Sequence, residues 1–110
     1  LNEPLFMEAA QALALKTLQG GGQTDRERVT FAFRRCLARR PEAEETRELL
    51  SLLQKQTARL AEGWISPWGI TGMDGKRRPE LPAGATPVQL AAWTTVSRVL
   101  LNLDETITKE

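Results

Sequence analysis

Arginine is the first kind of side chain in this sequence that is suited to binding a ligand. Four arginines occur within seven residues: Arg34, Arg35, Arg39 and Arg40. A guanidinium group binds a carboxylate, phosphate or sulfate through two parallel hydrogen bonds, so the group is compatible with a site for anions. We favour the alternative, a solvated helix end at which the cations complement the helix dipole. The short basic run 76–78 does not indicate nucleic-acid binding.

Tryptophan is the second kind of side chain here that is suited to binding a ligand. Trp64 and Trp68 lie four residues apart in a segment rich in glycine and proline. Exposed indole rings stack on sugars or anchor a protein interface. We favour the alternative that both rings fold back as a lid, because aromatic residues make up only 5% of the chain and leave its core small. A polysaccharide-binding surface stays open as a second hypothesis, and it would combine Trp64 and Trp68 with Arg34, Arg39 or Lys76.

Residues suited to catalysis are scarce. The chain has no histidine, which excludes an imidazole base, and its one cysteine excludes an internal disulfide. Cys36 lies on an apolar stripe, between Phe33 and Leu37. This position favours a small buried hydrophobic residue over a nucleophile. We therefore expect no metal or cofactor in this chain. The carboxylates that could still form a catalytic pair are those of Asp74, Asp104 and Glu105. A third hypothesis places Asn102, Asp104 and Glu105 in an active site shared with other domains of the larger protein.

Composition and charge are those of an ordinary globular domain. The 110 residues are 41% hydrophobic and 26% charged, and the formal net charge is +1, which gives no drive towards nucleic acid or anionic lipid. No apolar run approaches the roughly 20 residues that span a bilayer. Because the sequence starts without an initiator methionine or a signal peptide, we expect residues 1–110 to be a single helical domain that is a piece of a larger protein.

Local signals predict four main helices and an all-α bundle. Asn2 is a typical N-cap, and glycines at 20–22 would end the first helix. The capping box Thr24–Glu27 starts a second helix, which we expect to stop at Arg39-Arg40-Pro41. Helical periodicity marks a third over about 42–62, and Thr86-Pro87 starts a fourth that ends near Asn102. A long Gly/Pro/Trp-containing loop would join the last two.

The first helix is apolar on more than one side. Beyond its main stripe it carries Met7, Leu15 and Leu18. Such a helix is buried on several sides, either because it is central or because its second face meets another part of the protein. We take Met7, Leu15 and Leu18 as a docking face, and we expect Leu18→Asp to weaken docking without unfolding the isolated domain.

Three segments resemble a known protein family. Residues 1–10 are similar to its opening motif LNDPxFxEAA, residues 34–45 to its segment RxxLxRxPxxxE, and residues 92–105 to its closing motif AWxxVxRxLLNxxE. The family is the C-terminal domain of planctomycete and verrucomicrobial proteins that often contain a cytochrome-c-like domain, and it is catalogued as domain of unknown function 1553. The chain departs from the family pattern at Glu3, where aspartate is usual, and at Thr106, where phenylalanine is common.

The resemblance implies an extracytoplasmic parent protein, secreted or held in the cell envelope. It also implies that this domain closes the polypeptide and that its partners are upstream domains of the parent, with any haem held there. The family supplies no established activity, so it assigns no catalytic residue. Together with the residues, it favours a non-catalytic structural or docking module, with polysaccharide binding or a shared active site as the alternatives.

Overall fold

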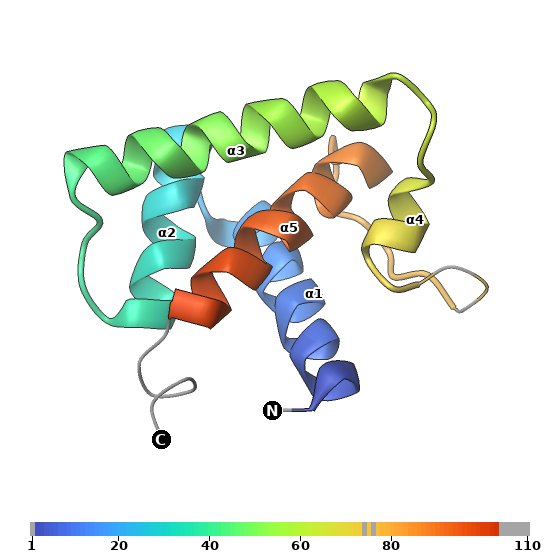
Figure 1. Ribbon diagram of the computed structural model, residues 1–110, viewed down its shortest axis with the longest axis horizontal. Coiled ribbons are helices and arrows are strands. Elements are labelled where there is room, and N and C mark those ends of the chain that lie inside the picture. Colours follow the sequence, from blue (N-terminus) through green and yellow to red (C-terminus); the bar gives the residue numbers. More distant parts are fainter. Residues whose placement is uncertain (1, 74, 76, 104–110) are drawn as a thin grey trace.

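A computed structural model describes residues 2–73, 75 and 77–103, and in this part of the chain all regular structure is helical (Figure 1). The predicted all-α class is therefore confirmed. The helices are α1 (Glu3–Gly20), α2 (Asp25–Leu37), α3 (Ala43–Ala61), α4 (Pro67–Ile70) and α5 (Pro87–Leu103). The sequence predicted the four long helices, whereas the one-turn α4 falls inside the segment that we expected to be a loop. None of the helices described is both long and apolar enough to cross a membrane.

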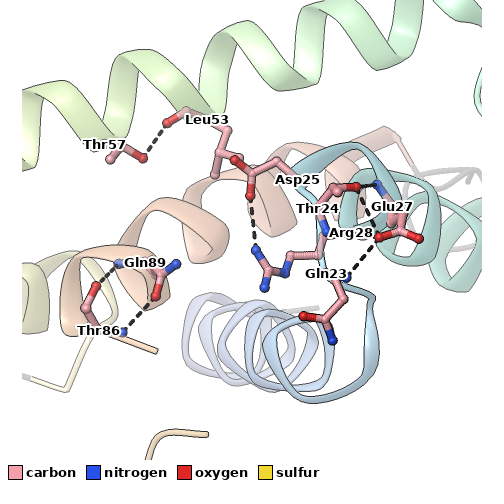
Figure 2. A network of polar contacts seen from close by, with 9 residues as sticks. All are labelled: Gln23, Thr24, Asp25, Glu27, Arg28, Leu53, Thr57, Thr86 and Gln89. Atoms are coloured by element: carbon pink, nitrogen blue, oxygen red, sulfur yellow. Dashed lines mark hydrogen bonds and ion pairs between the residues drawn. The ribbon is translucent and has the colours of Figure 1, made fainter. Parts of the chain in front are cut away.

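Side-chain caps start three of the long helices at the predicted positions. Asn2 Oδ1 accepts a hydrogen bond from the Leu5 N–H at 3.0 Å. Thr24 Oγ1 accepts from the Glu27 N–H at 3.1 Å, while Glu27 Oε1 accepts from the Thr24 N–H at 3.0 Å, which completes a capping box. Thr86 and Gln89 form the equivalent pair at the start of α5 (Figure 2). These bonds satisfy backbone donors that a helix leaves unpaired at its first turn.

The end of α2 differs from the prediction. The helix stops at Leu37 because Ala38 takes a left-handed conformation, with φ 56°, and its N–H donates to the Arg34 carbonyl. This single-residue stop is a common helix C-terminus, although glycine usually provides it. Arg39 consequently lies in the loop between α2 and α3, beyond the helix on which the sequence placed it.

The core is built around α5, which packs against each of the other four helices. In Figure 1, α5 lies between α3 and α1. Its buried face includes Trp93, at 1% exposure, together with Leu90 and Leu100, which are completely buried. The central position therefore belongs to α5, and the wide apolar surface of α1 is largely used against it.

The segment after α3 is tied to α1. The side-chain amide of Gln11 donates to the Thr71 carbonyl, and the Thr71 hydroxyl donates to the Trp68 carbonyl at 2.9 Å. Thr71 itself is completely buried. These bonds hold α4 and the turn that follows it against the body of the domain, so the start of the predicted loop has a defined position.

Candidate functional site

Arg39 binds a carboxylate of its own chain. Its two terminal nitrogens donate to the two carboxylate oxygens of Glu45, at 2.9 and 3.0 Å. The guanidinium carbon also lies 4.8 Å from the centre of the Phe33 ring, within the range of a cation–π contact. The fork that would bind an external anion is therefore already occupied, and Arg39 joins the α2–α3 loop to the first turn of α3.

The contact with Arg39 makes Glu45 unusually acidic. Hydrogen bonds from Arg39, followed by the Glu42 N–H at 2.8 Å, lower the pKa of Glu45 to about 2. Both donors favour the ionised carboxylate, and the positive charge of the guanidinium acts in the same direction. The shift has a structural cause at a helix start, which is sufficient to explain it without a catalytic role.

We expect Glu45→Gln to remove a pH-dependent part of the stability. Because the folded pKa, about 2, lies below the ordinary value of 4.5, Glu45 stabilises the fold above that value and loses this effect as the pH falls towards 2. The melting temperature of the variant should therefore lie below that of the wild type at neutral pH and converge with it in acid. Thermal melts across this range test it, with Glu44→Gln as the control that leaves the Arg39 contact intact. A gap that persists unchanged at the acid end would contradict the assignment.

The other predicted arginine, Arg34, lies exposed on the outer face of α2. It lines a shallow groove of about 430 Å³ with Thr30, Phe31 and Arg35. The guanidinium carbon of Arg35 lies 5.3 Å from the centre of the Phe31 ring. Glu27 lines the same groove, but it is engaged in the α2 capping box, whose hydrogen bonds from the Gln23 and Thr24 backbone lower its pKa.

The two tryptophans of the predicted lid behave differently. Trp68 is half-buried, packs against the core and lies under the Arg78 guanidinium, whose carbon is 4.7 Å from the ring centre. Trp64 is 86% exposed, so the lid is wrong for this residue. The reason is local: Ile65, the next residue, packs against the core and leaves the preceding side chain in solvent.

The structure does not bring the tryptophans and the arginines together. Arg39 binds Glu45 at the start of α3, and Trp64 follows the opposite end of that helix. The 19 residues of α3 span about 28 Å at 1.5 Å per residue. Figure 1 accordingly shows α2 and α4 at opposite ends of α3. In the described part of the chain, Trp64 and Trp68 therefore share no surface with Arg34 or Arg39. Lys76, the third cation of the polysaccharide hypothesis, lies outside the described residues.

The predicted docking face on α1 needs a correction. Leu18 is only 9% exposed and belongs to the hydrophobic core, so it is not available to a partner. Leu15 is half-buried and packs against the same core. Met7 is also half-buried and lines a groove of about 440 Å³ with residues after α4, including Met73 and Arg77. The apolar width of α1 is thus used mostly within the domain.

Most of the residues considered for catalysis lie outside the described part of the chain. Asp74, Asp104 and Glu105 lie outside it, and Asn102 is exposed in the last turn of α5. Cys36 is half-buried and packs against the core, as expected of a small hydrophobic residue. Among the residues that the structure describes, no group of three or more His, Cys, Asp or Glu side chains is placed to hold a metal ion.

A groove of about 300 Å³ lies between α1 and α2, and the sequence did not predict it. Ala9, Ala12 and Lys16 line it from α1, Arg35 and Cys36 from α2, and Leu101 from α5. Its one visible signal is the spacing of Leu5, Ala9, Ala12 and Lys16, which places these residues on a common face of α1. Small residues at helical spacing are as typical of a core as of a surface groove, so this signal did not identify it.

Comparison with models of known protein families, with curated proteins and with solved structures gives no match to this chain. Its function is therefore argued from the geometry described above.

Proposed function

We propose that the chain is a non-catalytic docking module of a larger extracytoplasmic protein and that Trp64 anchors the contact. The observation that carries the proposal is the 86% exposure of this side chain. A tryptophan buries 150–250 Å² when it is covered, so leaving it in water forgoes a large hydrophobic gain. Tryptophan is also among the residues that most often dominate the binding energy of protein interfaces.

The backbone presents Trp64 on a structured support. The Gly63 N–H donates to the Leu60 carbonyl at 3.1 Å, and Gly63 turns the chain at φ 83°. Ile65 then packs against the core, and α4 begins at Pro67. The indole ring therefore projects from a segment that is held on both sides, which reduces the entropy lost when a partner covers the ring.

A protein partner fits this surface better than a polysaccharide. Of the three tryptophans, all within the described residues, Trp93 is buried and Trp68 carries Arg78 on its ring, which leaves Trp64 as the exposed ring. Stacking along a sugar chain would favour more than one open ring. The family resemblance of the sequence suggests that the partner is an upstream domain of the parent protein, which would also hold any haem.

We expect Trp64→Ala to weaken binding to the upstream region of the parent by at least about 30-fold, the equivalent of a 2 kcal/mol hot spot. Calorimetric titration of the two parts measures the effect. Leu103→Ala, which truncates another exposed apolar side chain at 52% exposure, is the control and should bind normally. Equal affinities of wild type and Trp64→Ala would contradict the proposal. A loss of polysaccharide binding alone would favour the sugar-binding alternative.

A further inference from the structure

The groove between α1 and α2 has the shape and chemistry of a second binding surface. We call it the α1–α2 groove, and its walls are Ala9, Ala12 and Lys16 on one side and Arg35 and Cys36 on the other, with Leu101 of α5 between them. Its volume is about 300 Å³. It lies on α1 and α2, whereas Trp64 follows the far end of α3, so the two surfaces are separate.

The α1 wall has the residue spacing of a helix-packing seam. Leu5, Ala9, Ala12 and Lys16 follow one another at intervals of four, three and four residues. This alternation places side chains along one face of a helix and is the pattern by which two helices pack side by side. Leu5 is 49% exposed, and Ala12 is exposed too, so no part of the described structure covers this end of the seam. The two alanines leave room for the backbone of another helix to approach closely.

The rim of the groove is positively charged. Its cations are Lys16 of α1 and Arg35 of α2. In the described part of the chain the ion pairs are Arg28–Asp25 and Arg39–Glu45, so neither Lys16 nor Arg35 is paired with a carboxylate there. Among the residues that the structure describes, those lining the groove include no carboxylate. A complementary partner therefore carries negative charge next to its apolar contact.

We infer that the α1–α2 groove binds an amphipathic helix of a partner protein that carries carboxylates along the flank of its apolar face. The apolar seam provides the contact area, and Lys16 and Arg35 select the acidic flank. An anionic polysaccharide would use the cations alone and leave Leu5, Ala9 and Ala12 in water. The helical spacing of the apolar residues thus favours a helix over such a polymer.

Two stapled helical peptides test this inference directly. Both carry leucine and alanine on one face, and they differ in having either glutamate or lysine along the flanks. Titration into the ¹⁵N-labelled chain should shift the amide signals of Ala9, Ala12, Arg35 and Leu101 with the glutamate peptide. Its affinity should fall as salt is raised, because the rim charges are exposed. Binding at least 10-fold weaker is expected for the lysine peptide.

Variants of the chain make the test specific. Ala12→Glu should lower the affinity for the glutamate peptide at least 10-fold. The double variant Lys16→Glu/Arg35→Glu should reverse the preference, so that the lysine peptide binds more tightly. Ala58→Glu, the same change at an exposed position of α3, is the control and should bind as the wild type does.

Three results would overturn the inference. The peptides could bind equally, the shifted amides could lie outside the groove, or polyglutamate without an apolar face could bind as tightly as the helical peptide, which would mean an anion site only. Because Trp64 is not part of this surface, Trp64→Ala should leave peptide binding unchanged. If the peptide does not bind the groove, the proposal for Trp64 is unaffected. If Trp64 proves not to anchor a contact, the inference about the groove is likewise unaffected.

Discussion

Replacement of Trp93 by alanine should lower the free energy of unfolding by about 3–5 kcal/mol, the range observed when large aromatic side chains are removed from a core. Trp93 is 1% exposed and lies on α5, the helix that packs against all the others. Its removal leaves a cavity that the surrounding helices fill only in part. Since small domains are stable by about 5–15 kcal/mol, the variant should lose a large share of its stability. Urea unfolding followed by far-UV circular dichroism measures the change.

Trp64→Ala is the matched control, because it makes the same truncation at a site that is 86% exposed. We expect its stability to stay within about 0.5 kcal/mol of the wild type, as is usual for surface substitutions. The pair therefore separates a core tryptophan from a surface one. Equal destabilisation by the two substitutions would show that the Trp64 ring packs in solution, and it would remove the basis for its proposed role in docking.

The second large effect is expected for Leu18→Asp. Leu18 is 9% exposed and belongs to the core cluster. Removing a buried leucine costs about 2–5 kcal/mol, and placing a carboxylate without a partner in the same position adds to that cost. We therefore expect a loss of more than about 3 kcal/mol in the free energy of unfolding. The measurement is the same urea titration, in which the unfolding midpoint should fall sharply or the folded baseline should disappear.

Ala12→Asp provides the comparison for Leu18→Asp, since it introduces the same residue at an exposed position of the same helix. For Ala12→Asp we expect the free energy of unfolding to fall by at most about 1 kcal/mol, mainly because aspartate has a lower helix propensity than alanine. If Leu18→Asp unfolded at the wild-type midpoint, Leu18 would lie at the surface, where a docking residue is needed.

Local signals explain why the helices were predictable. The caps at Asn2, Thr24 and Thr86 act within four residues of the chain, and the structure contains each of them. The end of α2 was harder to predict, because the helix stops where Ala38 takes a left-handed conformation. Alanine has no special preference for that conformation. The prolines and tryptophans near α4 pointed only to a loop, because a single helical turn is too short to show periodicity.

Long-range packing explains what the sequence did not predict at the candidate sites. An apolar face of α1 has the same appearance whether α5 or another protein covers it, so the burial of Leu18 depended on the path of α5. Likewise, Trp64 and Trp68 have similar surroundings in the sequence, and they differ in exposure because Ile65 and Trp68 turn towards the core. The bidentate contact between Arg39 and Glu45 crosses a loop, and neither residue type nor spacing identified it.

The central position of α5 also has a consequence for biosynthesis. Of the helices described, α5 leaves the ribosome last, and until then α1 lacks the surface that buries Leu13, Ala14 and Leu18. From Gly20 to Leu103 the ribosome adds 83 residues, which takes roughly 4–17 s at about 5–20 residues per second. During that time the apolar face of α1 is open to chaperones or to other nascent chains. The domain therefore folds as a unit, and only after nearly all of it has been made.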